Sequence, residues 1–213
     1  YLYRAIVSGT CSPNATSNGA LLTVNQNTTI TLAPVAATGC EASTVQYTVT
    51  AVGTGLTYQW QEDDGGGFAN IANGGIYAGA TTTTLVLTGI TSAMHGYDYR
   101  VVVSGGCGPN QTSAGVNLTV NESPEITVQP VNSTICETTN TSFTVDAGVT
   151  TAPAYQWQES TNGGSSYANI VNGGIYAGAT TATLTLTGVP LGHNGYLYRA
   201  IVSGTCSPNA TSN

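Results

Sequence analysis

The densest cluster of potential metal ligands in the sequence is the acidic run 62–64 (Glu-Asp-Asp), which directly precedes three consecutive glycines. Hard cations such as Ca²⁺ prefer clustered oxygen ligands, so one interpretation of this run is a weak calcium site. The other interpretation is a solvated hairpin turn, because loop tips are normally polar. The related run 159–162 (Glu-Ser-Thr-Asn) keeps only the first of the three carboxylates. We therefore favour the turn and assign no metal ligand.

The two histidines, His95 and His193, do not occupy matching positions in the two units. No Ser-His-Asp arrangement can be built from them, so a place in a surface turn fits both better. Separated Asp and Glu residues could pair for glycoside hydrolysis, but nothing in the sequence places two of them on one concave face. We expect no enzymatic activity, no catalytic residue and no cofactor.

Aromatic side chains offer a third possible chemistry, because an exposed Tyr can stack on a sugar ring. Tyr77 and Tyr176 stand at the same place in a repeated segment, GGIYAGATT. The alternative is that both rings cover the edge of a β-sandwich between two of its strands. We favour the covering role, since the whole segment is built into every repeat.

The charge content excludes several classes of partner. Among 213 residues there are three Arg and no Lys, ten acidic residues and a formal net charge of −7. Three cations cannot neutralise a nucleic-acid backbone, so we expect no nucleic-acid partner. No apolar run approaches the roughly 18 residues of a membrane span, and no basic amphipathic stretch suits a membrane surface.

Two levels of internal repetition organise the chain. Residues 1–18 are identical to residues 196–213, at an offset of 195. Within that period, NGGIYAGATT occurs at 73–82 and 172–181, and YQWQE occurs at 58–62 and 155–159. The pattern predicts one period of a longer tandem array of two similar units, plus a short overlap, so neither end should be a natural terminus.

Each unit shows the alternation of apolar and polar residues that is typical of strands with one buried face. In the first unit Val45, Tyr47 and Val49 alternate with polar residues, and turn clusters break the chain about every ten residues. We predict an all-β fold of tandem β-sandwich domains with about seven strands each. In the first unit the strands should fall near 29–35, 44–53, 56–62, 68–71, 82–90, 96–104 and 114–121. The core should be centred on Trp60, Trp157, Tyr99 and Tyr198.

These residues resemble a known fold. A Trp on the third strand, a Leu-x-Leu strand and then Gly-Tyr-x-Tyr-Arg resemble the immunoglobulin-like sandwich. More narrowly, the pattern YQWQE…GG…ANI..GGIYAGATT…GY.YR..VSG.C.P resembles the immunoglobulin-like repeats of large surface proteins of Bacteroidota. Those proteins include secreted adhesins and gliding-associated filaments. The resemblance implies an extracellular location on the cell surface.

The cysteines depart from the antibody pattern, because Val101 and Ala200 stand where antibody domains place their second Cys. Cys40 precedes the second strand and Cys107 follows the sixth, so we expect a Cys40–Cys107 disulfide. By the same reasoning we expect Cys136–Cys206 in the second unit. Cys11 corresponds to Cys206, so its partner should lie in another unit. Persistent disulfides favour an oxidising, extracellular setting.

The expected domain division follows from the repeats. Residues 1–28 should be the last two strands of a preceding domain, 29–124 a complete domain, and 125–213 a domain without its last strand. That missing strand should read like residues 19–24, so either the array is continuous or separate subunits complete one another head to tail. The junction near 121–125 is short and contains a proline, which predicts a restricted angle between units.

The sequence contains eight Asn-x-Ser/Thr sequons, where composition alone would produce about four. They are possible glycosylation sites and begin at Asn14, Asn27, Asn110, Asn117, Asn121, Asn132, Asn140 and Asn209. We interpret the chain as a structural repeat of a bacterial surface filament or stalk, whose partners are copies of itself. The alternatives are an adhesin whose repeats bind a glycan or a host protein, and a spacer within a secreted enzyme.

Overall fold

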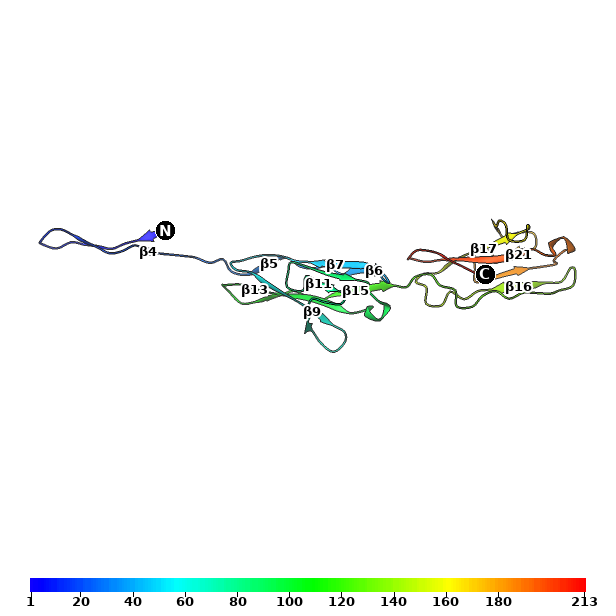
Figure 1. Ribbon diagram of the computed structural model, residues 1–213, viewed down its shortest axis with the longest axis horizontal. Coiled ribbons are helices and arrows are strands. Elements are labelled where there is room, and N and C mark those ends of the chain that lie inside the picture. Colours follow the sequence, from blue (N-terminus) through cyan, green and yellow to red (C-terminus); the bar gives the residue numbers. More distant parts are fainter.

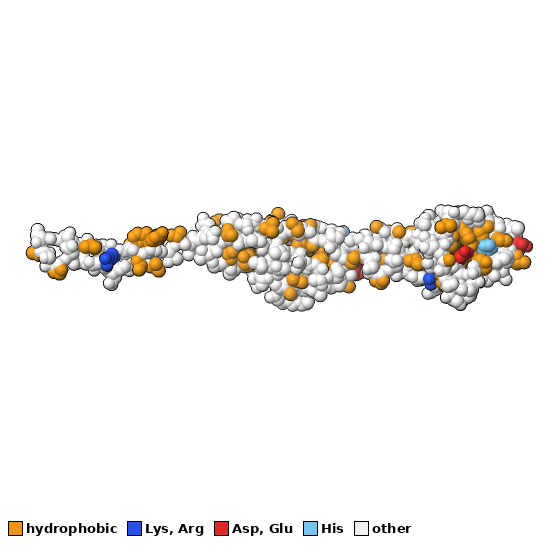
Figure 2. Space-filling model, turned by 90° about the horizontal axis from the view of Figure 1, so that it is seen from above, with side chains coloured by type: hydrophobic (Ala, Val, Ile, Leu, Met, Phe, Trp, Pro, Cys, Tyr) orange, Lys and Arg blue, Asp and Glu red, His pale blue; other side chains and the backbone are white.

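The computed structural model describes residues 1–213 and shows an elongated rod with three parts in chain order: a detached hairpin, a first sandwich and a second sandwich (Figure 1). Every regular element is a β-strand except two short 3-10 turns, η1 (Ser92–Met94) and η2 (Leu191–His193). The expected all-β class of tandem sandwich domains is confirmed. The space-filling view shows few charged side chains along the rod (Figure 2).

The hairpin is made of two antiparallel ribbons and touches neither core. Its strands are β1 (Leu2–Tyr3), β2 (Ile6–Val7), β3 (Ala15–Thr16) and β4 (Ala20–Leu21). β1 pairs with β4, and β2 pairs with β3. All of its residues are exposed, because the hairpin has no second layer on which to bury an apolar face.

The first sandwich has two main layers. One sheet has the strand order β10-β9-β13-β15-β6, with β14 added to β13, and the other has the order β11-β12-β7. A separate ribbon joins β5 to β8. The bounds are β5 (Thr29–Leu32), β6 (Ala37–Cys40), β7 (Thr44–Thr48), β8 (Thr50–Val52), β9 (Thr57–Asp63), β10 (Ala69–Asn70), β11 (Tyr77–Ala78), β12 (Thr84–Thr88), β13 (Asp98–Ser104), β14 (Gln111–Thr112) and β15 (Val116–Asn121).

The second sandwich repeats most of this plan with the sheets β18-β17-β21-β22 and β16-β20-β19. Its register matches the first: Trp157 pairs with Ala200 across β17 and β21, as Trp60 pairs with Val101 across β9 and β13. No strand occupies the places that β15 and β6 hold in the first sandwich. The bounds are β16 (Thr141–Thr144), β17 (Ala154–Ser160), β18 (Ala168–Asn169), β19 (Tyr176–Ala177), β20 (Thr183–Leu186), β21 (Leu197–Ser203) and β22 (Ala210–Thr211).

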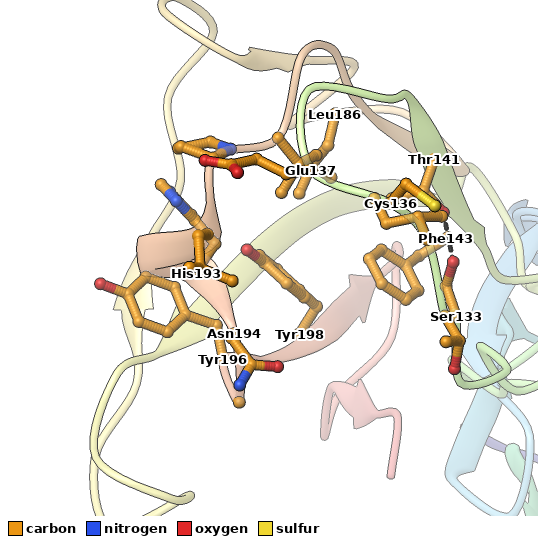
Figure 3. A pocket seen from close by; sticks show the side chains of 16 residues that line it. Ser133, Cys136, Glu137, Thr141, Phe143, Leu186, His193, Asn194, Tyr196 and Tyr198 are labelled. Carbon is orange, nitrogen blue, oxygen red and sulfur yellow. Dashed lines mark hydrogen bonds between the residues drawn. The ribbon is translucent and has the colours of Figure 1, made fainter.

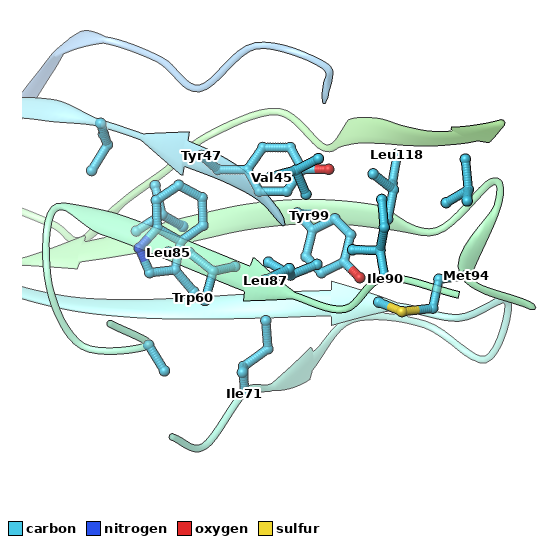
Figure 4. Close-up of a cluster of buried hydrophobic side chains, with 14 of the residues drawn as sticks. Val45, Tyr47, Trp60, Ile71, Leu85, Leu87, Ile90, Met94, Tyr99 and Leu118 are labelled. Atoms are coloured by element: carbon cyan, nitrogen blue, oxygen red, sulfur yellow. The ribbon is translucent and has the colours of Figure 1, made fainter. Parts of the chain in front are cut away.

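The core of each sandwich is built around its single Trp. Trp60, Trp157 and Tyr99 are fully buried, and Figure 4 shows Trp60 and Tyr99 among the aliphatic side chains of the first core. Each indole Nε1–H donates a hydrogen bond of 2.9 Å to a backbone carbonyl, that of Thr82 or Thr181. A buried indole keeps its polar atom satisfied in this way.

Tyr198 differs from the expectation, because it is only half-buried. Its counterpart Tyr99 is covered by β15, which supplies the buried Leu118 and Val120. The second sandwich has no strand at that place, so one side of the Tyr198 ring faces an open groove. The difference therefore comes from the sheet edge and not from the residue.

The repeated GGIYAGATT segment covers the buried Trp of each sandwich. Gly79 has a φ of +77°, and a Cβ there would lie 2.1 Å from the carbonyl oxygen of Thr84, so only glycine fits. Tyr77 is half-buried against the core, and its hydroxyl donates a hydrogen bond to Glu62. The covering role is therefore the one observed for Tyr77, and Tyr176 makes the same bond to Glu159 at 2.5 Å.

Candidate functional site: the cross-linked junction and the open groove

The junction between the two sandwiches is closed by a disulfide that the sequence did not predict. Cys40 is bonded to Cys206, with an S–S distance of 2.04 Å and a Cα–Cα distance of 5.8 Å. Cys40 ends β6 of the first sandwich, and Cys206 follows β21 of the second. The bond therefore joins two domains that are also joined by the linker.

The expected pairs Cys40–Cys107 and Cys136–Cys206 are wrong, and topology is the reason. β6 runs parallel to β15, and Cys40 pairs with Asn121, so Cys40 lies at the end where the chain leaves the first sandwich. Cys107 follows the antiparallel β13 and lies at the entry end, where its carbonyl accepts a hydrogen bond from the Thr28 amide at 3.1 Å. The two cysteines of one sandwich thus lie at opposite ends, far beyond the reach of a disulfide.

The linker is fastened to the second sandwich by hydrogen bonds. The Glu122 amide donates to Thr151 Oγ1 at 2.7 Å, and the Glu125 amide donates to Thr150 Oγ1 at 3.0 Å. The Val149 amide donates to a Glu125 carboxylate oxygen at 3.1 Å. With Pro124 between these residues, little of the linker can act as a free tether.

The entry end of the first sandwich repeats this construction. The Gln26 amide donates to Thr54 Oγ1 at 2.8 Å, as Glu122 does to Thr151. The Gly106 amide donates to the Thr54 carbonyl at 2.8 Å, as the Thr205 amide does to the Thr151 carbonyl at 3.0 Å. Cys107 therefore has the same position relative to its incoming chain as Cys206 has at the junction.

Three cysteines are unpaired in this chain: Cys11, Cys107 and Cys136. Cys11 is exposed in the detached hairpin, and Cys107 is half-buried at the entry end of the first sandwich. Cys136 is exposed beside the groove of the second sandwich. Cys107 and Cys136 thus mark the two outward ends of the cross-linked pair of sandwiches.

An open groove runs along the edge of the second sandwich (Figure 3). It has a volume of about 240 Å³ and lies between the segment 133–137 on one side and the turn 193–196 on the other. The aromatic and aliphatic side chains of Phe143, Leu186 and Tyr198 line it. Figure 3 shows Cys136 and Phe143 on one side of it, with His193 and Tyr196 opposite. The groove has the position that β15 fills in the first sandwich.

The acidic run 62–64 is engaged in structural hydrogen bonds. Asp63 Oδ1 accepts the amides of Gly65 and Gly67 at 2.9 and 2.8 Å, and Asp64 Oδ1 accepts the Gly66 amide at 3.2 Å. These bonds stabilise the turn, as the hairpin interpretation expected. No group of three or more His, Cys, Asp or Glu side chains is placed to hold a metal ion.

Glu62, the first residue of the run, interacts with two tyrosines instead of with the turn. It accepts hydrogen bonds from the hydroxyls of Tyr77 and Tyr99, the latter at 3.0 Å. Burial raises the pKa of Tyr99 far above its ordinary value, and burial followed by the bond to Glu62 raises the pKa of Tyr77. The second sandwich repeats the cluster, and burial raises the pKa values of Tyr176 and Tyr198. These phenols stay protonated as donors, which is a structural role.

His95, Arg100 and Arg199 are also held by neighbouring groups. His95 Nδ1 accepts the Val120 amide at 3.1 Å, which fixes the end of β15. Arg100 lies over the ring of Phe68 at 3.9 Å, and Arg199 lies over that of Tyr167 at 3.8 Å. His193 lies in the groove wall, and its Nδ1 is buried without a hydrogen-bond partner.

Seven of the eight sequon asparagines are exposed, and Asn121 is half-buried at the junction. The amide of Asn117 donates to the Gly96 carbonyl at 3.0 Å, and Asn140 Oδ1 accepts the Gly188 amide at 2.9 Å. Those two side chains are partly engaged. The exposed asparagines without such bonds are Asn14, Asn27, Asn110, Asn132 and Asn209.

Comparison with known proteins supports the fold. A family model described as a domain of unknown function (DUF8696) matches residues 126–213, which form the second sandwich. No curated protein matches the sequence. No helix is both long enough and apolar enough to cross a membrane.

Several solved structures of tandem immunoglobulin domains are similar. The I-band fragment I67–I69 of titin has a TM-score of 0.63 at 16% identity, covering 90% of this chain and 64% of the fragment. Extracellular domains 3–5 of Drosophila OTK have a TM-score of 0.55 at 18% identity, covering 99% and 69%. The insect immune protein hemolin has a TM-score of 0.54 at 13% identity, covering 99% and 54%. At these identities the likeness shows the fold alone: the chain is a tandem array of immunoglobulin-like sandwiches.

Proposed function

We infer that this chain is a structural repeat of an extracellular bacterial filament or stalk, in which sandwiches follow one another head to tail as a stiff rod. The observation that carries this function is the Cys40–Cys206 disulfide across the domain junction. A single short linker permits bending and twisting between domains. A second covalent connection beside the first removes most of that freedom, and a stiff rod requires this restriction.

In this proposal the chain divides as the repeats suggest. Residues 1–28 correspond to the last two strands of one repeat, 29–124 to a complete domain, and 125–213 to a domain without its last strand. The register supports this division, because Tyr3 pairs with Ala20 as Tyr99 pairs with Val116. The copies of the repeat are then each other's partners.

The chemistry of the chain supports an extracellular setting. Disulfides persist in oxidising compartments and are rare in the reducing cytosol. The low charge, the exposed sequons and the resemblance to repeats of Bacteroidota surface proteins agree with a position on a bacterial surface. The carboxylates of the run 62–64 and His95 are engaged in structural hydrogen bonds, which supports a non-catalytic role.

Two measurements test this function. Antibodies raised against the chain should label extracellular filaments of the source bacterium in immunogold electron microscopy. Small-angle scattering of the chain should give one extended shape when Cys40 and Cys206 are bonded, and a broader distribution after reduction. Label confined to the cell interior would contradict the proposal. Specific binding of the isolated chain on a glycan array would favour the adhesin alternative instead.

A further inference from the structure

The Cys40–Cys206 disulfide gives the chain a second covalent route through the rod. Along the backbone the two cysteines are 166 positions apart, and the strands β7 to β21 and the linker lie between them. Through the disulfide they are directly joined. A chain that is drawn taut carries tension along its shortest covalent connection, because each residue has a fixed maximal reach. The strands between the two cysteines therefore lie outside the path of a pulling force.

In the first sandwich this path follows one segment from end to end. The segment 29–40 contains β5 and β6. It begins at the entry end, where the Thr28 amide donates to the Cys107 carbonyl at 3.1 Å, and it ends at the exit end, where Cys40 pairs with Asn121. Figure 1 shows β5 near the hairpin and β6 near the second sandwich. The other strands pair with this segment at its side and are not needed to transmit the force.

The path through the second sandwich has the same form. Cys206 lies at the entry end, where the amide of its neighbour Thr205 donates to the Thr151 carbonyl at 3.0 Å. Residues 207–213 lead away from it through β22, which pairs with β21. The equivalent residues 108–121 of the first sandwich reach the exit end through β14 and β15. A single segment at the side of the core again carries the tension.

We propose that the junction disulfide has a mechanical function: it removes the cores of both sandwiches from the path of tension, so that the rod resists extension even when a core unfolds. This inference rests on the proposed function, because a surface filament or stalk is exposed to pulling forces. In this chain the path consists of residues 1–40 and 206–213. The linker and both buried Trp residues lie outside it.

The internal repeat extends this inference to the proposed array. Cys11 is the copy of Cys206, because residues 1–18 and 196–213 are identical at an offset of 195. In each period only the residues equivalent to 11–40 then lie in the path. An extended residue spans at most about 3.5 Å, so a fully stretched period reaches about 100 Å with the bond and about 680 Å without it.

Stretching single molecules of the full chain tests this inference. The substitutions Cys11→Ser, Cys107→Ser and Cys136→Ser leave only the junction bond, and peptide tags at the two ends hold the chain. The oxidised chain should reach no more than about 170 Å at full extension, and the same molecules should reach about 750 Å after reduction by dithiothreitol, a more than fourfold increase. A step of about 300 Å in the oxidised chain, the length of one unfolded sandwich, would overturn the proposal.

The matched control is the same chain with the further substitution Cys206→Ser. In oxidising buffer it should reach the length of the reduced chain. This readout does not depend on how well the variant folds, because the length at full extension depends only on how many residues lie in the path. A Cys206→Ser chain as short as the oxidised chain would contradict the assigned path.

Cutting the linker supplies a second test. A variant with the recognition sequence of a specific protease inserted after Glu122 can be stretched before and after cleavage. Oxidised molecules should keep their tether and their force–extension curve after cleavage, because the linker lies outside the path. Loss of the tether on cleavage, or a longer cleaved chain, would refute the inference.

These measurements use the isolated chain and are independent of the filament role. Extracellular immunogold label together with steps of one sandwich in the oxidised chain would leave the filament role standing and refute only the mechanical inference. A short oxidised chain together with label confined to the cell interior would do the reverse.

Discussion

The two sandwiches share motifs and register, but the second has no counterpart of β15 or of β6. The first contains β15, and its core has 15 buried residues, whereas the core of the second has nine. The same Tyr in the same position is fully buried as Tyr99 and half-buried as Tyr198. The comparison shows that the last strand does more than extend a sheet. It closes the core and organises the parallel segment that ends at Cys40.

The largest expected effect concerns the residue that the two cores share. Trp60→Ala and Trp157→Ala should each destabilise their own sandwich by about 3–5 kcal/mol, because each removes a fully buried side chain and its hydrogen bond. Urea titrations followed by amide exchange in β9 and β17 would assign the loss to one sandwich. Tyr1, which is 92% exposed, supplies the control, since Tyr1→Ala should change the stability of neither sandwich. A loss in both sandwiches from either substitution would show that they unfold as one unit.

The next effect concerns the covalent link between the sandwiches. Cys206→Ser should lower the free energy of unfolding by about 2–4 kcal/mol, because it opens a ring that spans 166 positions of sequence. It should also broaden the distribution of angles between the sandwiches in small-angle scattering. Cys11→Ser is the matched control, because Cys11 is exposed and unpaired. Peptide mapping that finds Cys40 bonded to Cys107 would contradict the disulfide between the two sandwiches.

The disulfide shows where sequence reasoning reaches its limit. Alternation in residues 45–49 located β7, and the spacing of Trp60 and Tyr99 indicated facing strands, because both signals are local. β6 was missed because Ala-Thr-Gly-Cys has no run of large apolar residues, and its pairing with β15 depends on a strand about 80 residues away in sequence. The cysteine partners depend on which end of the sandwich each one reaches. Had the sequence revealed that β6 runs parallel to β15, it would have placed Cys40 at the exit end of the first sandwich. The pair Cys40–Cys206 would then have been the expected disulfide.

The groove was partly within reach of the sequence. The repeats predicted that the second unit would be without its last strand, which should read like residues 19–24. The half-burial of Tyr198 required coordinates, because it depends on how the remaining strands hold their positions around an unfilled edge. His193 was expected in a surface turn, and it lies in the groove wall because it occupies the position of the buried Met94.

A smaller effect comes from a core position that differs in polarity between the two sandwiches. Tyr47 stacks on Tyr99 with ring centroids 4.9 Å apart, and its buried hydroxyl has no hydrogen-bond partner. Phe143 stacks on Tyr198 in the same way at 5.0 Å. Tyr47→Phe should therefore raise the stability of the first sandwich by about 1 kcal/mol, because it removes an unsatisfied buried group. The reverse change, Phe143→Tyr, should be nearly neutral, since its hydroxyl can reach the open groove.

The smallest expected difference is the response of the two sandwiches to alkali. Burial, with a contribution from Asp98, raises the pKa of Tyr47 above its ordinary value, so the first sandwich has three such tyrosines, with Tyr77 and Tyr99. The second has two, Tyr176 and Tyr198. An unfolded phenol ionises near pH 10, whereas the folded state keeps these phenols neutral. Their contribution to stability is complete below about pH 10 and is lost as the pH rises through the folded values, because the unfolded chain then binds fewer protons.

Amide exchange between pH 9 and 11, corrected for its intrinsic pH dependence, should therefore show the first sandwich losing protection more steeply than the second. Tyr47→Phe removes the third phenol, so in that variant the two slopes should converge. Convergence would assign the difference in alkali response to the hydroxyl of Tyr47, which its counterpart Phe143 lacks. A slope in the first sandwich that is unchanged by Tyr47→Phe would instead assign it to the closed edge at β15, where Tyr99 is covered and Tyr198 is not.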